Sequence, residues 1–139
     1  MRVISLGDAS YSDCLDTRRS STGDIHTIGG ALVSWRAQKT PFVCLSSAEA
    51  EYICATHATK EAKWLNFIAS EISQNPDKIS PIKILEDNTA CIKMAKNPIV
   101  SGRNKHMGCK ISYLREQVAN KSIFLEHIRT DKQLSLIHI

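Results

Sequence analysis

The stretch from Ser46 to Ile72, SSAEAEYICATHATKEAKWLNFIASEI, decides the fold because it is longer and more regular than the apolar runs around it. It is rich in Ala, Glu and Lys, and its apolar residues recur at three- and four-residue spacings: Tyr52, Ala55, Ala58, Ala62, Leu65, Ile68 and Ile72. This period predicts one long amphipathic helix over 48–72. Ser46 and Glu49 form a capping-box pattern at its start.

Short apolar runs separated by turn residues come before this helix. The runs at 3–6, 25–28 and 31–35 are read as strands, with turns at 20–23 and at Gly29-Gly30. Connections this short predict a three-stranded antiparallel meander.

The residues after the helix alternate between strand and helix patterns. We expect a buried strand over 82–85, a helix over 88–95, a second helix over 105–120 and a last strand over 122–128. Later strands joined through helical crossovers predict an α/β fold, a mixed sheet with helices packed on it, in one domain.

Composition excludes several classes of protein. The chain has 139 residues, 42% hydrophobic and 23% charged, so it is neither a disordered tail nor a fibrous repeat. No apolar run approaches the roughly 20 residues of a membrane span. The odd count of five cysteines argues against a closed disulfide framework and favours buried thiols as small apolar filler. The net charge of +4 is a weak indication of polyanionic partners.

Three acidic residues stand at the ends of the expected elements. Asp8 follows the first strand, Glu49 lies in the first helical turn and Asp87 follows the strand over 82–85. Carboxylates that share a site are stable with divalent cations between them, so this set is a candidate metal site. Glu51, about 200° around the helix from Glu49, and Glu86, on the opposite strand face from Asp87, are expected to point elsewhere. The plainer interpretation is that the three acids only cap helices and form turns.

Several collinear blocks resemble the ribonuclease H domain of copia-type retrotransposon Pol polyproteins, and they extend from about Ser5 to Gln133. The blocks are Asp8-Ala9, 15–23 (LDTRRSSTG), 29–35 (GGALVSW), 45–52 (LSSAEAEY), 60–65 (KEAKWL), 86–88 (EDN), 96–98 (KNP) and Lys105-His106.

The resemblance implies a ribonuclease H-like fold, a five-stranded mixed sheet with three antiparallel strands and then two parallel ones. It implies an endonuclease that cleaves the RNA strand of RNA–DNA hybrids during reverse transcription, with two Mg²⁺ ions, or Mn²⁺ as a substitute. Asp8, Glu49 and Asp87 would be the catalytic and metal-binding residues. The expected partners are the hybrid and the reverse transcriptase domain of the same polyprotein, with no membrane. The implied location is intracellular, in a cytoplasmic virus-like particle.

Basic and polar residues near these blocks are candidates for substrate binding. They are Arg18, Arg19, Asn88, Arg103, Lys105 and His106. Basic side chains can hold the phosphates of a hybrid, although each also fits a solvated surface. Trp35 and Trp64 are expected in the core rather than as platforms for stacked bases.

The C-terminal end departs from the family pattern. The family closes with Gln-Leu-Ala-Asp, whose Asp is a fourth metal-site acid, whereas here Gln133-Leu134 is followed by Ser135-Leu136. Residues 134–139, LSLIHI, resemble a translated sequencing adapter, so we expect the ribonuclease H-like domain to span 1–133 and the tail 134–139 to be non-native. A missing acid predicts reduced activity. The alternatives are an inactive hybrid-binding remnant and a structural domain docked on reverse transcriptase; an integrase core ranks last.

Overall fold

A computed structural model of the chain describes residues 2–74, 81–96, 108–129 and 131. Its first part is an antiparallel meander of β1 (Val3–Ser10), β2 (Ser21–Ile28) and β3 (Ala31–Lys39). Gly29 and Gly30, both with positive φ (59° and 86°), form the two-residue turn between β2 and β3. Such a turn matches the twist of the strands and favours glycine at both positions.

The second part alternates helices and strands. α1 (Ser47–Ile72) crosses to β4 (Ile82–Glu86), and α2 (Thr89–Lys96) and α3 (Gly108–Ala119) lead to β5 (Ile123–His127). β4 pairs in parallel with both β1 and β5, giving the strand order β3-β2-β1-β4-β5. The expected sheet, three antiparallel strands and then two parallel ones, is confirmed.

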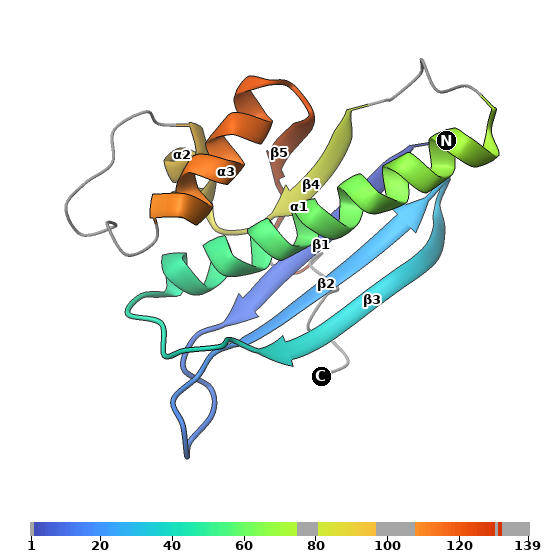
Figure 1. Ribbon diagram of the computed structural model, residues 1–139. Coiled ribbons are helices and arrows are strands. Elements are labelled where there is room, and N and C mark those ends of the chain that lie inside the picture. Colours follow the sequence, from blue (N-terminus) through green and yellow to red (C-terminus); the bar gives the residue numbers. More distant parts are fainter. Residues whose placement is uncertain (1, 75–80, 97–107, 130, 132–139) are drawn as a thin grey trace.

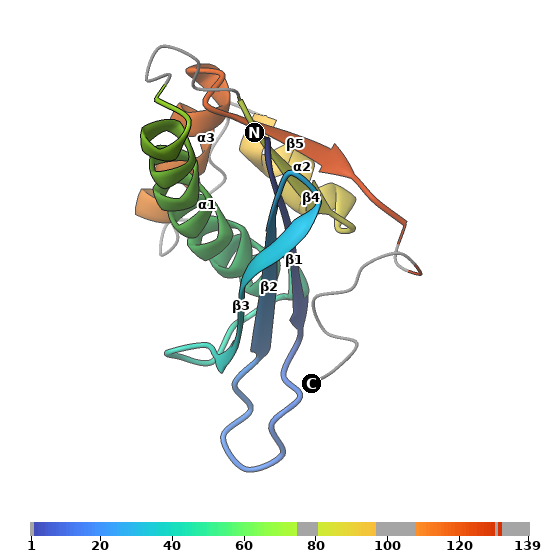
Figure 2. The same ribbon diagram turned by 90° about the vertical axis from the view of Figure 1, so that its right-hand side faces the viewer.

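The helices bury one face of the sheet. α1 runs along β1 and β2 and also contacts β4, while α2 and α3 pack near β5 (Figure 1). Figure 2 shows α1 and α3 together on one side of the sheet. Alternate strand residues face this layer, and the core includes Val3, Ile84 and Ile123 with Tyr52 and Leu114 of the helices. Within the described residues, no helix is both long enough and apolar enough to cross a membrane.

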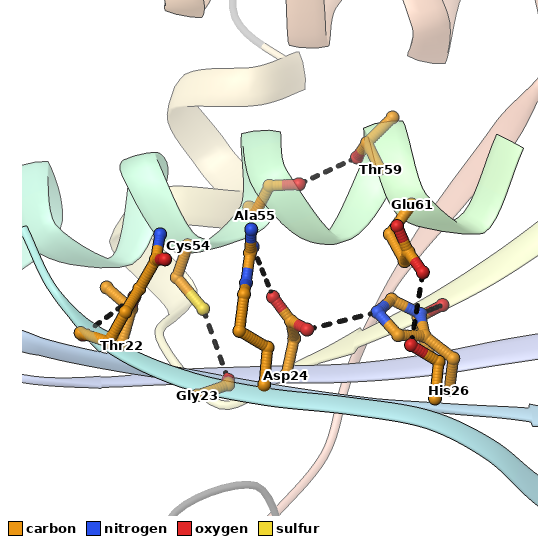
Figure 3. A network of polar contacts seen from close by, with 12 residues as sticks. Thr22, Gly23, Asp24, His26, Cys54, Ala55, Thr59 and Glu61 are labelled. Atoms are coloured by element: carbon orange, nitrogen blue, oxygen red, sulfur yellow. Dashed lines mark hydrogen bonds and ion pairs between the residues drawn. The ribbon is translucent and has the colours of Figure 1, made fainter. Parts of the chain in front are cut away.

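A polar cluster lies between β2, β3 and α1 (Figure 3). The buried Asp24 carboxylate accepts from Arg36 Nη2 at 2.7 Å and lies 3.2 Å from His26 Nε2. Since a carboxylate only accepts, His26 Nε2 carries a proton, and His26 Nδ1 forms a hydrogen bond with the Ser5 hydroxyl at 2.7 Å. Hydrogen bonding therefore satisfies polar groups that burial would otherwise make costly.

Two local expectations from the sequence are wrong. Residues 21–23, expected in a turn, belong to β2, because β1 continues to Ser10 and pairs with them. Trp35 and Trp64 are 70% and 57% exposed rather than in the core. Trp35 lies on the edge strand β3, and Trp64 stacks on Phe67, also exposed, with ring centroids 6.1 Å apart. Cys44, Cys54 and Cys91 are buried, as expected of filler thiols, whereas Cys14 is only half-buried.

Candidate metal centre

Three carboxylates from separate elements converge at one end of the sheet. Asp8 lies near the end of β1, Glu51 in α1 and Asp87 directly after β4. Each offers one oxygen, and these oxygens all lie within 4.8 Å of one another. Because β1 and β4 are parallel neighbours, their carboxyl ends meet at the same edge, where the first part of α1 passes (Figure 1).

The expectation that Glu49 would face Asp8 and Asp87 is wrong, and so is the expectation that Glu51 would point away. Glu49 Oε2 accepts the backbone N–H of Leu45 at 2.7 Å, and the Glu49 N–H donates to Ser46 Oγ at 3.1 Å. The Glu49 side chain thus folds back over the start of α1 as part of its cap. Both glutamates are buried, but Glu51 is the one that α1 brings to Asp8 and Asp87.

Glu51 is tied to Asp8 through the backbone of β1. The Ala9 N–H lies 2.9 Å from Asp8 Oδ1 and 3.3 Å from Glu51 Oε1, so one donor lies within reach of both carboxyl groups. The other oxygen, Glu51 Oε2, is buried and has no hydrogen-bond partner among the described residues.

Glu86 forms a second buried carboxyl group behind the three acids. Its side chain lies against that of Glu51, contrary to the expectation that Glu86 points elsewhere. It is not a member of the three-carboxylate group. Glu86 is fully buried, and its Oε2 also has no hydrogen-bond partner among the described residues.

The electrostatics of these groups favour a bound cation. Burial, reinforced by the carboxyl groups of Glu86 and Asp8, raises the pKa of Glu51 to about 11. Burial raises the pKa of Glu86 to about 8 and that of Asp8 above its ordinary value. Such shifts mean that negative charge is costly here without a compensating positive charge.

The donor set fits a hard divalent cation. The three side chains offer only oxygen atoms, and Mg²⁺ and Mn²⁺ prefer such ligands over nitrogen or sulfur. The partnerless Glu51 Oε2 is a buried acceptor that a cation or a proton would satisfy.

The candidate substrate-binding residues are only partly described. Arg18 and Arg19 are exposed in the loop between β1 and β2, which leaves the sheet at the end of β1 (Figure 1). Asn88 stands at the start of α2, where its Oδ1 accepts the Cys91 N–H at 3.1 Å, so a capping role accounts for it. Arg103, Lys105, His106 and the tail 134–139 lie outside the described residues.

Comparison with curated proteins finds retrotransposon polyproteins. The chain is 32% identical over 125 residues to the "Retrovirus-related Pol polyprotein from transposon TNT 1-94" of Nicotiana tabacum, covering 90% of this chain and 9% of that protein. It is 28% identical over 135 residues to the polyprotein from transposon RE1 of Arabidopsis thaliana, covering 97% of this chain and 9% of that protein. The chain therefore spans about a tenth of the length of these relatives. No protein-family model matches it.

Solved structures similar to this chain include ribonucleases H. RNase H1 from the halophilic archaeon Halobacterium salinarum superimposes with a TM-score of 0.69 at 14% identity, over 96% of this chain and 89% of that one. LC11-RNase H1 in complex with RNA/DNA hybrid gives 0.66 at 12% identity, over 95% and 88%. The Prototype Foamy Virus protease-reverse transcriptase gives 0.67 at 14% identity, over 99% of this chain and 19% of that one.

The two kinds of comparison agree with the resemblance expected from the sequence. The curated relatives are Pol polyproteins, and the solved structures are ribonuclease H enzymes or include a reverse transcriptase. This chain accordingly has the ribonuclease H fold and is related to a segment of retrotransposon Pol polyproteins.

Proposed function

We propose that this domain is an endonuclease that hydrolyses the RNA strand of RNA–DNA hybrids during the reverse transcription of a copia-type retrotransposon. The observation that supports it most is the convergence of Asp8, Glu51 and Asp87 within a ribonuclease H fold. Fold alone does not specify chemistry, whereas an oxygen-only cluster at the meeting point of two strand ends and a helix does suggest it.

The reaction is an in-line displacement at phosphorus. The water oxygen bonds to phosphorus as the bond to the 3′ oxygen breaks, one water proton is released and the leaving 3′ oxygen takes up a proton, so the products carry 5′-phosphate and 3′-hydroxyl ends. Two bound Mg²⁺ ions would supply an activated water and stabilise the leaving oxygen.

The protein's own contribution is to hold and orient the ligands. Asp8 would contribute to both cation positions, and Glu51 and Asp87 would complete them from α1 and from the end of β4. The Ala9 N–H, within reach of Asp8 and Glu51, keeps their carboxyl groups beside each other. Fixed ligands reduce the reorganisation needed when the substrate arrives.

The relatives support a proposal for the partners of this chain. One of the similar structures is a complex with RNA/DNA hybrid, and another includes a reverse transcriptase. For this chain we propose an RNA–DNA hybrid as substrate, the reverse transcriptase domain of the same polyprotein as neighbour, and a cytoplasmic virus-like particle as location. Arg18 and Arg19, exposed in the loop that leaves the end of β1, are available to contact the hybrid backbone.

A pair of glutamates two positions apart on one helix tests the proposal. Cleavage of a labelled RNA–DNA hybrid in Mg²⁺ should be lost in Glu51→Gln and Asp8→Asn and retained in Glu49→Gln. Hybrid binding should remain in all three variants, because phosphate contacts come from basic side chains. Equal cleavage by Glu51→Gln and the parent chain would refute the metal centre. Loss of cleavage in Glu49→Gln but not in Glu51→Gln would show that Glu49, as expected from the sequence, is the metal-binding glutamate.

The missing fourth acid sets the expected strength of the activity. Leu136 occupies the position of that acid in the resemblance, so cation binding should be weak and the Mg²⁺ demand high. Leu136→Asp should then cleave the hybrid at lower Mg²⁺ than the parent chain. If neither chain cleaves hybrid at any Mg²⁺ concentration while both bind it, the domain is an inactive hybrid-binding remnant.

A further inference from the structure

Glu86 is a buried carboxyl group that neither the cluster nor the hydrophobic core explains. It is fully buried at the end of β4, where its strand neighbours on the same face, Ile82 and Ile84, are apolar. A buried acid in an apolar layer is costly unless its oxygens are used. The contacts of this side chain therefore indicate what it does.

One oxygen of Glu86 holds the turn that carries Asp87. Glu86 Oε1 accepts the backbone N–H of Asn88 at 3.0 Å, which closes the chain around Asp87. Asn88 in turn accepts the Cys91 N–H through its side chain and so starts α2. The direction in which Asp87 leaves β4 thus depends on the acceptor that Glu86 provides.

The rest of the Glu86 carboxyl group lies against Glu51. The side chains of these two residues lie against each other, and Glu86 Oε2 has no hydrogen-bond partner among the described residues. Glu86 consequently touches one cluster carboxylate and holds the backbone of another. The Glu86 carbonyl also accepts the Ile128 N–H at 2.9 Å, which anchors the residue to the segment after β5.

We propose that Glu86 is a positioning residue, whose carboxyl group holds the turn after β4 and braces Glu51 so that Asp87 and Glu51 can bind the same cations. This inference rests on the proposed metal centre and assigns no cation contact to Glu86 itself. Groups that orient metal ligands without touching the metal change its affinity about 10- to 100-fold when replaced.

Three variants of Glu86 separate the effect of the hydrogen-bond acceptor from that of the charge. Glu86→Gln keeps an oxygen acceptor for the Asn88 N–H, and its amide can donate to Glu51. Glu86→Met fills a similar volume without an acceptor, and replacing a buried charge by an apolar group is often tolerated. Glu86→Asp keeps the charge but is too short to reach both partners, so it covers the case in which Glu86→Met does not fold.

The test measures Mn²⁺ binding to the whole chain by isothermal titration calorimetry, with Asp8→Asn as the control for the cluster. Glu86→Gln should bind within about threefold of the parent, and Glu86→Met and Glu86→Asp about 10- to 100-fold more weakly. Parent-like binding in Glu86→Met or Glu86→Asp would overturn the positioning role, and so would equal weakening in Glu86→Gln. A parent chain that binds Mn²⁺ no better than Asp8→Asn would overturn the metal centre itself, and this inference with it.

Discussion

Replacing Glu51 by Gln should stabilise the metal-free protein although it should destroy the cation site. Glu51 is 6% exposed, and burial together with Glu86 and Asp8 raises the pKa of its carboxyl group to about 11. In the unfolded chain the same group titrates near its ordinary value of 4.5. The folded protein must therefore keep a proton on Glu51 at neutral pH, whereas the unfolded chain releases it.

The sign and size of the effect follow from this difference in bound protons. An acid with a raised pKa in the folded state is protonated in both states below its unfolded pKa, so it does not lower the free energy of unfolding there. The free energy of unfolding then falls as the pH rises from the unfolded pKa towards the folded pKa. A pH of about 7.5 lies roughly 3 pH units above the unfolded pKa of 4.5. At about 1.36 kcal/mol per pH unit, the ionisation of Glu51 in the unfolded chain lowers the free energy of unfolding by roughly 4 kcal/mol. Any pKa of Glu51 in the folded protein that lies well above the assay pH gives the same loss in the free energy of unfolding. Gln does not titrate, and its Oε1 can still accept the Ala9 N–H.

The assay is urea unfolding in EDTA from about pH 5 to 8, with Glu49→Gln as the matched control on the same helix. The free energy of unfolding of Glu51→Gln should exceed that of the parent by an amount that grows with pH. Adding Mn²⁺ should stabilise the parent more than Glu51→Gln. Parallel pH curves for the parent and Glu51→Gln would refute the reasoning.

Two further predictions concern the scaffold beneath the site. In urea titrations, Asp24→Ala should lower the free energy of unfolding by about 2 kcal/mol, because His26 Nε2–H loses its buried acceptor. The control Asp13→Ala removes a more exposed ion pair and should lower the free energy of unfolding by about 0–1 kcal/mol. Burial opposes the ionised form of Asp24, but its two hydrogen-bond partners lower its pKa below 3.8, so its contribution should be present above that pH and disappear on further acidification. Gly7→Val should cost about 1–3 kcal/mol, since a Cβ there would lie 3.2 Å from Cys54 Sγ. Cys54→Ala should recover part of that loss in a double-mutant cycle, and additive effects of the two changes would contradict the steric explanation.

Local sequence patterns predicted much of the fold. The period of α1, the Gly29-Gly30 turn and the alternation of strands and helices predicted the order of the elements along the chain, and the family resemblance implied the five-stranded mixed sheet. These features depend on residues a few positions apart, and their geometry repeats with a fixed period. The extent of β1 and β2 and the exposure of Trp35 were missed, because strand length and edge position depend on partners far away in the chain.

By itself, the sequence predicted that Asp8 and Asp87 would converge, because both stand at strand ends; they meet in the structure because β1 and β4 are parallel neighbours. The capping box also contained the signal that Glu49 was already used, since Glu in that position turns back to the helix start. Only the tertiary structure decided that Glu51 would complete the group and that Glu86 would lie behind it. That outcome depends on how α1 is rotated against β1 and β4, and the rotation is set by the packing of the whole apolar face rather than by the residues beside the acids.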